Sequence, residues 1–78
     1  MSSNYERIIA LINKVSPYED VNEDTELIES GIIDSLSLLM LITLINEEFN
    51  INIVENDFIR ANFETVSTIA CLTKKYTD

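Results

Sequence analysis

The 78-residue sequence contains no histidine and no tryptophan, and it has one cysteine, one glycine and one proline. Without histidine, the chain cannot build a Ser-His-Asp triad, a Cys-His pair or any metal site that needs an imidazole ligand. The single cysteine, Cys71, cannot form a disulfide within the chain, which favours a reducing compartment and a cytoplasmic location. Because glycine and proline are scarce, tight hairpin turns are scarce as well, and a β-sheet is disfavoured.

Acidic residues outnumber basic ones by 14 to 5, so the formal net charge is −9. No basic residue lies between positions 15 and 59. This acidic window should repel nucleic acid and attract basic patches on protein partners, although a solvated acidic surface that aids solubility would look the same. The longest apolar run is too short to span a bilayer, and the N-terminus lacks the pattern of a signal peptide. We therefore expect neither nucleic-acid binding nor membrane insertion.

The length predicts a single domain, 1–78, with a core so small that the chain must be mostly helical to bury enough apolar surface. Apolar residues recur at helical spacing in three segments. The expected fold is all-α, a small four-helix bundle with a long first loop. We expect long helices over 3–15, 35–49 and 66–76, a short one of about one and a half turns near 56–61, and a loop over 16–33.

Local signals mark the ends of these elements. Ser3 has capping-box spacing before the first helix, Ser16-Pro17 ends that helix, and Thr65 suits the N-cap of the last one. In the short helix, Phe58 and Ile59 should face inward. The loop should be anchored by apolar side chains, namely Val21, Leu27, Ile28, Ile32 and Ile33. The core faces of the second and last helices should comprise Leu38, Leu41, Ile42, Ile45 and Phe49, and Val66, Ile69, Ala70 and Thr73.

One pattern in the loop imitates a calcium site. Asp20, Asn22 and Asp24 have the spacing that opens an EF-hand loop. However, Thr25 stands where that loop needs glycine, and Gly31 stands where it needs a bidentate glutamate. We therefore exclude a calcium site of the EF-hand type.

The chain is organised around the run Gly31-Ile32-Ile33-Asp34-Ser35-Leu36. Gly31 is expected to supply a backbone angle that other residues disfavour. Asp34 suits the N-cap of the second helix, where its carboxylate can accept from free backbone N–H groups at the positive end of the helix dipole. Ser35 then becomes the first helical residue, with its hydroxyl accessible to another protein. Taken alone, an Asp-Ser pair at a helix start is explained by capping.

The residues around this run form a longer pattern that is typical of a known family. Leu27-x-x-x-Gly31-Ile32-x-Asp34-Ser35-Leu36, followed by an apolar helix that ends in Glu47-Glu48-Phe49, resembles the acyl and peptidyl carrier proteins. The resemblance covers nearly the whole chain. It implies that Ser35 carries 4′-phosphopantetheine, attached from coenzyme A by a phosphopantetheinyl transferase. It further implies a monomer that receives an acyl or aminoacyl group from a ligase or adenylation enzyme and delivers it to a downstream synthase or transferase.

The second helix has more apolar residues than its core face needs. The surplus lies beside Thr43 and Glu47 and comprises Leu36, Leu39, Met40 and Leu44. Such a surplus indicates a partner-docking surface, since no helix of so small a bundle is wrapped completely. In the carrier family this helix is the main surface that partners read, with Glu47 and Glu48 as its charged rim here. Fatty-acid-type carriers often have acidic residues where this chain has Met40 and Asn46, which puts a fatty-acid-synthase role in doubt.

The predicted function is therefore that of a stand-alone acyl or peptidyl carrier rather than an enzyme, in a nonribosomal-peptide, polyketide or related pathway. No base is available to activate Ser35, and neither a metal cage nor a glycine-rich phosphate loop is evident. Within the family, a D-alanyl carrier of teichoic acid modification or a fatty acid carrier are the alternatives. Outside it, the alternative is a non-catalytic helical interaction module whose Asp34 only caps a helix.

Overall fold

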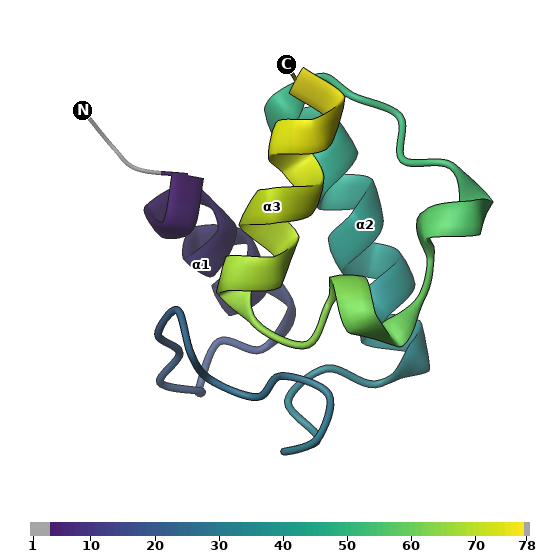
Figure 1. The fold of residues 1–78 in the computed structure, drawn as a ribbon. Helices are drawn as coiled ribbons and strands as arrows, with labels where there is room; N and C mark the ends of the chain where they lie inside the picture. Colours follow the sequence, from purple (N-terminus) through teal and green to yellow (C-terminus); the bar gives the residue numbers. More distant parts are fainter. Residues whose placement is uncertain (1–3, 78) are drawn as a thin grey trace.

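Three α-helices dominate the computed structural model, which describes residues 4–77 (Figure 1). They are α1 (Asn4–Val15), α2 (Ser35–Phe49) and α3 (Val66–Thr77). No strand occurs among the described residues. The predicted all-α fold is thus confirmed, and the described ends of the three long helices lie within one residue of their predicted positions. The capping role predicted for Ser3 lies outside the described residues.

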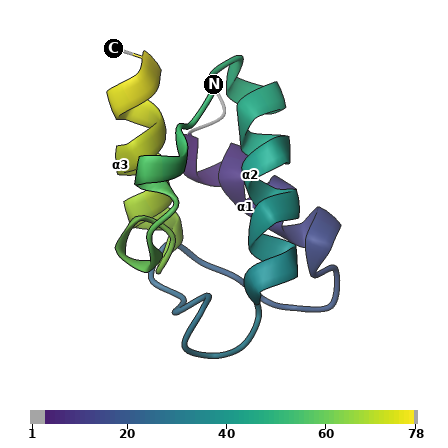
Figure 2. The same ribbon diagram turned by 90° about the vertical axis from the view of Figure 1, so that its right-hand side faces the viewer.

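The helices α2 and α3 run in the same direction, whereas α1 crosses them and packs against both (Figures 1 and 2). The contact between α2 and α3 is smaller than the contact of either helix with α1. The long loop between α1 and α2 passes below the ends at which α2 and α3 begin (Figure 2). The start of α2 and this loop therefore share one end of the molecule.

The core combines one face of each helix with anchors from the connecting segments. Its fully buried side chains include Leu27 and Ile33 from the first loop and Phe63 from the second connection. Removing so many aliphatic side chains from water is the main stabilising contribution to a domain of this size. The buried apolar residues are Ile8, Leu11, Ile12, Leu27, Ile33, Leu41, Ile42, Ile45, Ile53, Phe63, Val66, Ile69 and Leu72.

The first loop is held by hydrogen bonds as well as by apolar anchors. The backbone N–H of Leu27 donates to the carbonyl of Glu64 at 2.8 Å, and the N–H of Ile33 donates to the carbonyl of Leu27 at 2.9 Å. The hydroxyl of Ser16 donates to the carbonyl of Ile32 at 2.9 Å, which ties the start of the loop to its end. These bonds fix the path of the chain into α2, so the start of that helix has a defined position.

The last helix begins with the cap that the sequence predicts. The N–H of Thr68 donates to Oγ1 of Thr65 at 3.2 Å, and the N–H of Thr65 donates to Oγ1 of Thr68 at 3.1 Å. This reciprocal pair satisfies two backbone donors at the helix start, as a capping box does.

The connection between α2 and α3 departs from expectation. Instead of one short helix near Asn56–Ala61, it contains two single 3-10 turns, η1 (Glu55–Asp57) and η2 (Arg60–Asn62). Between them, Ile59 has an extended backbone, with φ −115° and ψ 148°. A continuous helix cannot pass through a residue in that conformation.

The side chain of Asn62 explains why the predicted short helix is interrupted. The carbonyl of Asp57 accepts from Nδ2 of Asn62 at 2.9 Å, where a continuous helix would use a backbone donor. Phe58 packs partly buried against the core, as expected. The inward orientation expected for Ile59 is wrong, since 51% of this residue is exposed. The kink between the two turns sends consecutive side chains to opposite sides of the connection.

Candidate functional site

The helix cap at Asp34 is present as predicted. Asp34 has an extended backbone, and its Oδ1 accepts from the backbone N–H of Ser37 at 2.9 Å. That N–H, followed by the hydroxyl of Ser37, holds the pKa of the Asp34 carboxyl below its ordinary value of 3.8. The carboxylate therefore stays ionised at neutral pH and satisfies one of the unpaired donors at the start of α2.

Ser35 is the first residue of α2, and it is exposed. Its place in the first turn puts the hydroxyl beside backbone N–H groups that have no carbonyl partner within the helix. Such a helix start favours a bound phosphate, because the free N–H groups and the helix dipole both attract negative charge. A group attached through a phosphodiester at this hydroxyl would extend into solvent from one end of the molecule.

Gly31 turns the chain toward this helix start. Its φ of +83° lies in the left-handed region, which residues with a Cβ disfavour. A Cβ built at this position would meet no atom within 4 Å. Glycine is thus required here by the backbone angle rather than by lack of space.

The exposed side of α2 begins with three large apolar residues, which we call the α2 patch: Leu36, Leu39 and Met40. They are 70%, 54% and 51% exposed, respectively. The helix itself has no charged residue before Glu47. A partner that covers this surface would therefore bury apolar side chains, not pair charges.

Two other residues predicted to belong to this surface differ in their environment. Thr43 is exposed, and its hydroxyl donates to the carbonyl of Leu39 at 3.1 Å. Leu44 is only partly exposed and packs against the core, so it offers a partner less surface than the residues of the α2 patch. Its position on the helix places it between the exposed side and the core-facing stripe.

The two glutamates at the end of α2 have different environments. Glu47 is exposed. Glu48 accepts from Nε of Arg7 at 2.9 Å through its carboxylate, and from Nη2 of Arg7 at 3.0 Å through its carbonyl. The guanidinium of Arg7 also lies 4.1 Å from the centroid of the Phe49 ring. Arg7 thus fastens α1 to the end of α2 and neutralises one of the two charges predicted for the docking rim.

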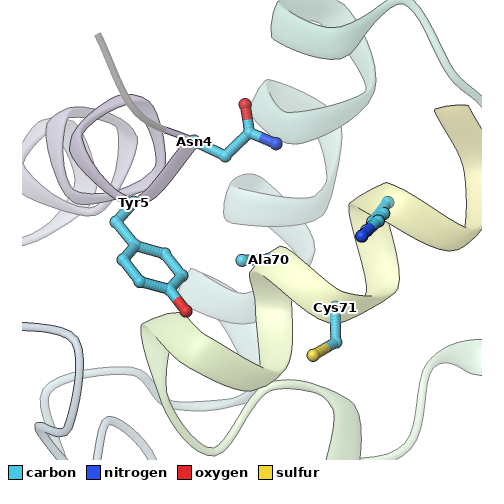
Figure 3. Close-up of a pocket in the computed structure, with 5 residues that line it drawn as sticks. Asn4, Tyr5, Ala70 and Cys71 are labelled. Carbon is cyan, nitrogen blue, oxygen red and sulfur yellow. The ribbon is translucent and has the colours of Figure 1, made fainter.

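A hollow of about 380 Å³ lies between α1 and α3, away from the start of α2. Figure 3 shows Asn4, Tyr5, Ala70 and Cys71 around it, and Lys74 completes the lining. None of these residues belongs to the Gly31–Leu36 motif. Cys71 is exposed.

The acidic loop is organised by its own side chains. Oδ1 of Asn22 accepts from the backbone N–H of Asp24 at 2.8 Å, and Oγ1 of Thr25 accepts from the N–H of Asn22 at 2.9 Å. Within residues 4–77, no three potential metal-ligating side chains of histidine, cysteine, aspartate or glutamate come together. In the same part of the chain, no helix combines the length and apolar character needed to cross a membrane.

The comparisons with known proteins agree with this geometry. Residues 6–71 match the family described as phosphopantetheine attachment site. The chain belongs to this family, and it is a carrier domain that carries covalently attached 4′-phosphopantetheine. This family is one of carriers rather than catalysts.

Two curated relatives match nearly the whole chain. Each is named D-alanyl carrier protein, and they come from Lactococcus lactis subsp. cremoris strains MG1363 and SK11. Both are 31% identical over 75 residues, which cover 94% of this chain and 95% of the relative. No solved structure shows a significant match.

Some exposed features outside α2 could not be predicted from local patterns. Val54 and Ile59, each 51% exposed, add large apolar side chains on the connection between α2 and α3. Arg60 forms an ion pair with Glu29, which joins this connection to the loop before α2. Both features depend on how distant segments fold together.

Proposed function

We propose that Ser35 is the residue that carries the phosphopantetheine arm. The observation that supports this most is its place as an exposed hydroxyl in the first turn of α2, within a chain that belongs to the attachment family. The Asp34 carboxylate accepts from the Ser37 N–H, so it also steadies the turn that contains Ser35.

The chemistry needs a partner enzyme, because the chain has no histidine and the carboxylate next to Ser35, that of Asp34, caps the helix through the Ser37 N–H. The lowered pKa of that carboxyl also makes it a weak base. A phosphopantetheinyl transferase would remove the hydroxyl proton, so that Oγ of Ser35 attacks the phosphorus that bears the pantetheine of coenzyme A. A new P–O bond forms, the bond within the diphosphate breaks, and adenosine 3′,5′-bisphosphate leaves. When bound, the arm supplies a terminal thiol that holds an acyl or aminoacyl group as a thioester. The carrier contributes a high local concentration of that group once it docks.

The test compares two serines of the same turn. The wild type, Ser35→Ala and Ser37→Ala would each be incubated with coenzyme A, magnesium and a promiscuous transferase, and the intact masses recorded. We expect a gain of one phosphopantetheine group in the wild type and in Ser37→Ala, and none in Ser35→Ala. Modification of Ser35→Ala would overturn the assignment.

We further propose that the enzymes that load the arm and receive its cargo dock on the α2 patch, with Thr43, Glu47 and the partly neutralised Glu48 at its edge. The support is the large exposed fraction of Leu36, Leu39 and Met40 on a helix that lacks charge beside them. Apolar anchors of this kind mainly slow the release of a partner, whereas charges at the edge mainly speed its association. Leu44 would contribute indirectly, by holding α2 against the core.

For the cargo, we propose an amino acid or a small acyl group, transferred by an activating ligase and delivered to a downstream synthase or transferase. D-alanine is the specific candidate favoured by the names of the two relatives. The absence of acidic residues at Met40 and Asn46 argues against a fatty-acid-synthase carrier. The holo-protein would be offered to a D-alanine-activating ligase, and in parallel to an acyl-activating enzyme. Thioester formation with the acyl group alone would contradict an amino acid cargo.

A further inference from the structure

The connection between α2 and α3, residues 51–62, has little backbone structure of its own. We call it the strap. Its two 3-10 turns contain only local backbone hydrogen bonds, such as the N–H of Phe58 to the carbonyl of Glu55 at 2.9 Å. Isolated single turns of this kind are unstable without side-chain support. The strap must therefore be held in place by the rest of the molecule.

The strap connects α2 and α3, which contact each other less than either contacts α1. Figures 1 and 2 show that it leaves the end of α2 and returns beside α3. Ile53 of the strap is buried, with 3% of its surface exposed, and Phe58 packs partly buried against the core. When the strap is displaced, these apolar side chains lose their cover.

One phenol on α3 fastens the strap. The hydroxyl of Tyr76 accepts from the backbone N–H of Val54 at 3.1 Å and donates to Oδ2 of Asp57. The side chain of Asp57 is only 19% exposed, and its other oxygen lies 3.6 Å from Nζ of Lys75. A single side chain of α3 thus binds both the start of the strap and its first turn.

A second fastening comes from α2. Oδ1 of Asn46 accepts from the backbone N–H of Ile53 at 3.0 Å. Just before the strap, Asn50 has a left-handed backbone with φ 55° and ends the helix. The strap therefore begins at a sharp change of chain direction and is held by Asn46 on one side and Tyr76 on the other.

We propose that the strap opens as one unit while the three helices stay folded, and that Tyr76 is the latch that controls this opening. Segments with few buried contacts and side-chain-dependent hydrogen bonds open before the helical core does. The opened form exposes Ile53 and Phe58, so any ligand or enzyme that contacts these side chains selects it. This device depends on neither the arm nor the cargo, so it can be tested on the unmodified chain.

The experiment is native-state hydrogen exchange of the wild type, Tyr76→Phe and Asn46→Ala. Tyr5→Phe is the matched control, since it removes a phenol hydroxyl from α1 and touches neither fastening. In Tyr76→Phe, two hydrogen bonds are lost, and we expect exchange of the strap amides to rise by about tenfold. The amides of Phe58 and Asn62, which do not bond to Tyr76, must rise together with Val54.

Asn46→Ala removes a different hydrogen bond but opens the same unit. It should therefore accelerate the same set of strap amides, with the central amides of α1 unchanged in both variants. If only the Val54 amide exchanges faster in Tyr76→Phe, the phenol makes only a local contact, and the proposal is overturned. Equal acceleration of every amide in the chain would mean global destabilisation and would overturn it as well.

Discussion

Replacing Met40 by glutamate should separate arm attachment from partner docking. Met40 is 51% exposed in the free carrier, so a partner that covers it can bury about half of the side chain. Burial of a whole methionine stabilises by about 1.5–3 kcal/mol, so losing half of that costs about 1 kcal/mol. A neutral polar group forced into the same contact without a partner costs about 1–3 kcal/mol, and a carboxylate costs at least as much.

The combined penalty of about 2–4 kcal/mol predicts that kcat/KM for loading falls by about 30-fold or more. The assay is thioester formation by the loading ligase, with holo-carrier prepared enzymatically and its mass verified. Ala10→Glu is the matched control, because Ala10 is exposed on α1 and acquires the same charge. If the two variants load within about threefold of each other, docking on the α2 patch is refuted.

Three further predictions concern the elements that hold the site. Gly31→Ala should lower the free energy of unfolding by about 1–2 kcal/mol through its positive φ, as measured by urea denaturation; a variant as stable as the wild type would contradict the backbone argument. Phe63→Ala should cost about 3–5 kcal/mol, because this ring is 0% exposed and leaves a cavity at the base of α3; a loss below about 1 kcal/mol would mean that Phe63 is not a core anchor. The Asp34 carboxyl should titrate below 3.8 by NMR, so its cap stabilises the fold above that pH and loses this effect as the pH falls through the lower, folded-state pKa; a midpoint at or above 3.8 would contradict the cap.

Much of this architecture could be predicted because its signals are local. The cap at Asp34, the positive φ at Gly31 and the cap at Thr65 each depend on residues within a few positions of one another. The core faces of α2 and α3 follow from helical spacing, and Leu27 and Ile33 were expected to be buried because they are apolar residues in a largely polar loop. The exposed surplus at Leu36, Leu39 and Met40 was predicted in the same way.

The remaining features depend on contacts between distant segments. The side chain of Asn62 donates to the carbonyl of Asp57, and the predicted short helix is divided into two turns. Helical periodicity does not reveal such a contact. Arg7 reaches Glu48 across 41 positions of the chain, so one of the two glutamates predicted to form the charged rim is already paired. Likewise, Leu44 lies at the boundary of the apolar stripe, and helical spacing alone does not reveal that it packs partly buried against the core.

The central claim is that the arm is attached at the start of α2. The most direct test modifies the wild-type chain with coenzyme A and a transferase, digests it and locates the phosphopantetheine by fragment mass spectrometry. We predict a single modified fragment, with the group assigned to Ser35. Assignment to Ser30 or Ser37, or no modification by any of several transferases, would contradict the account.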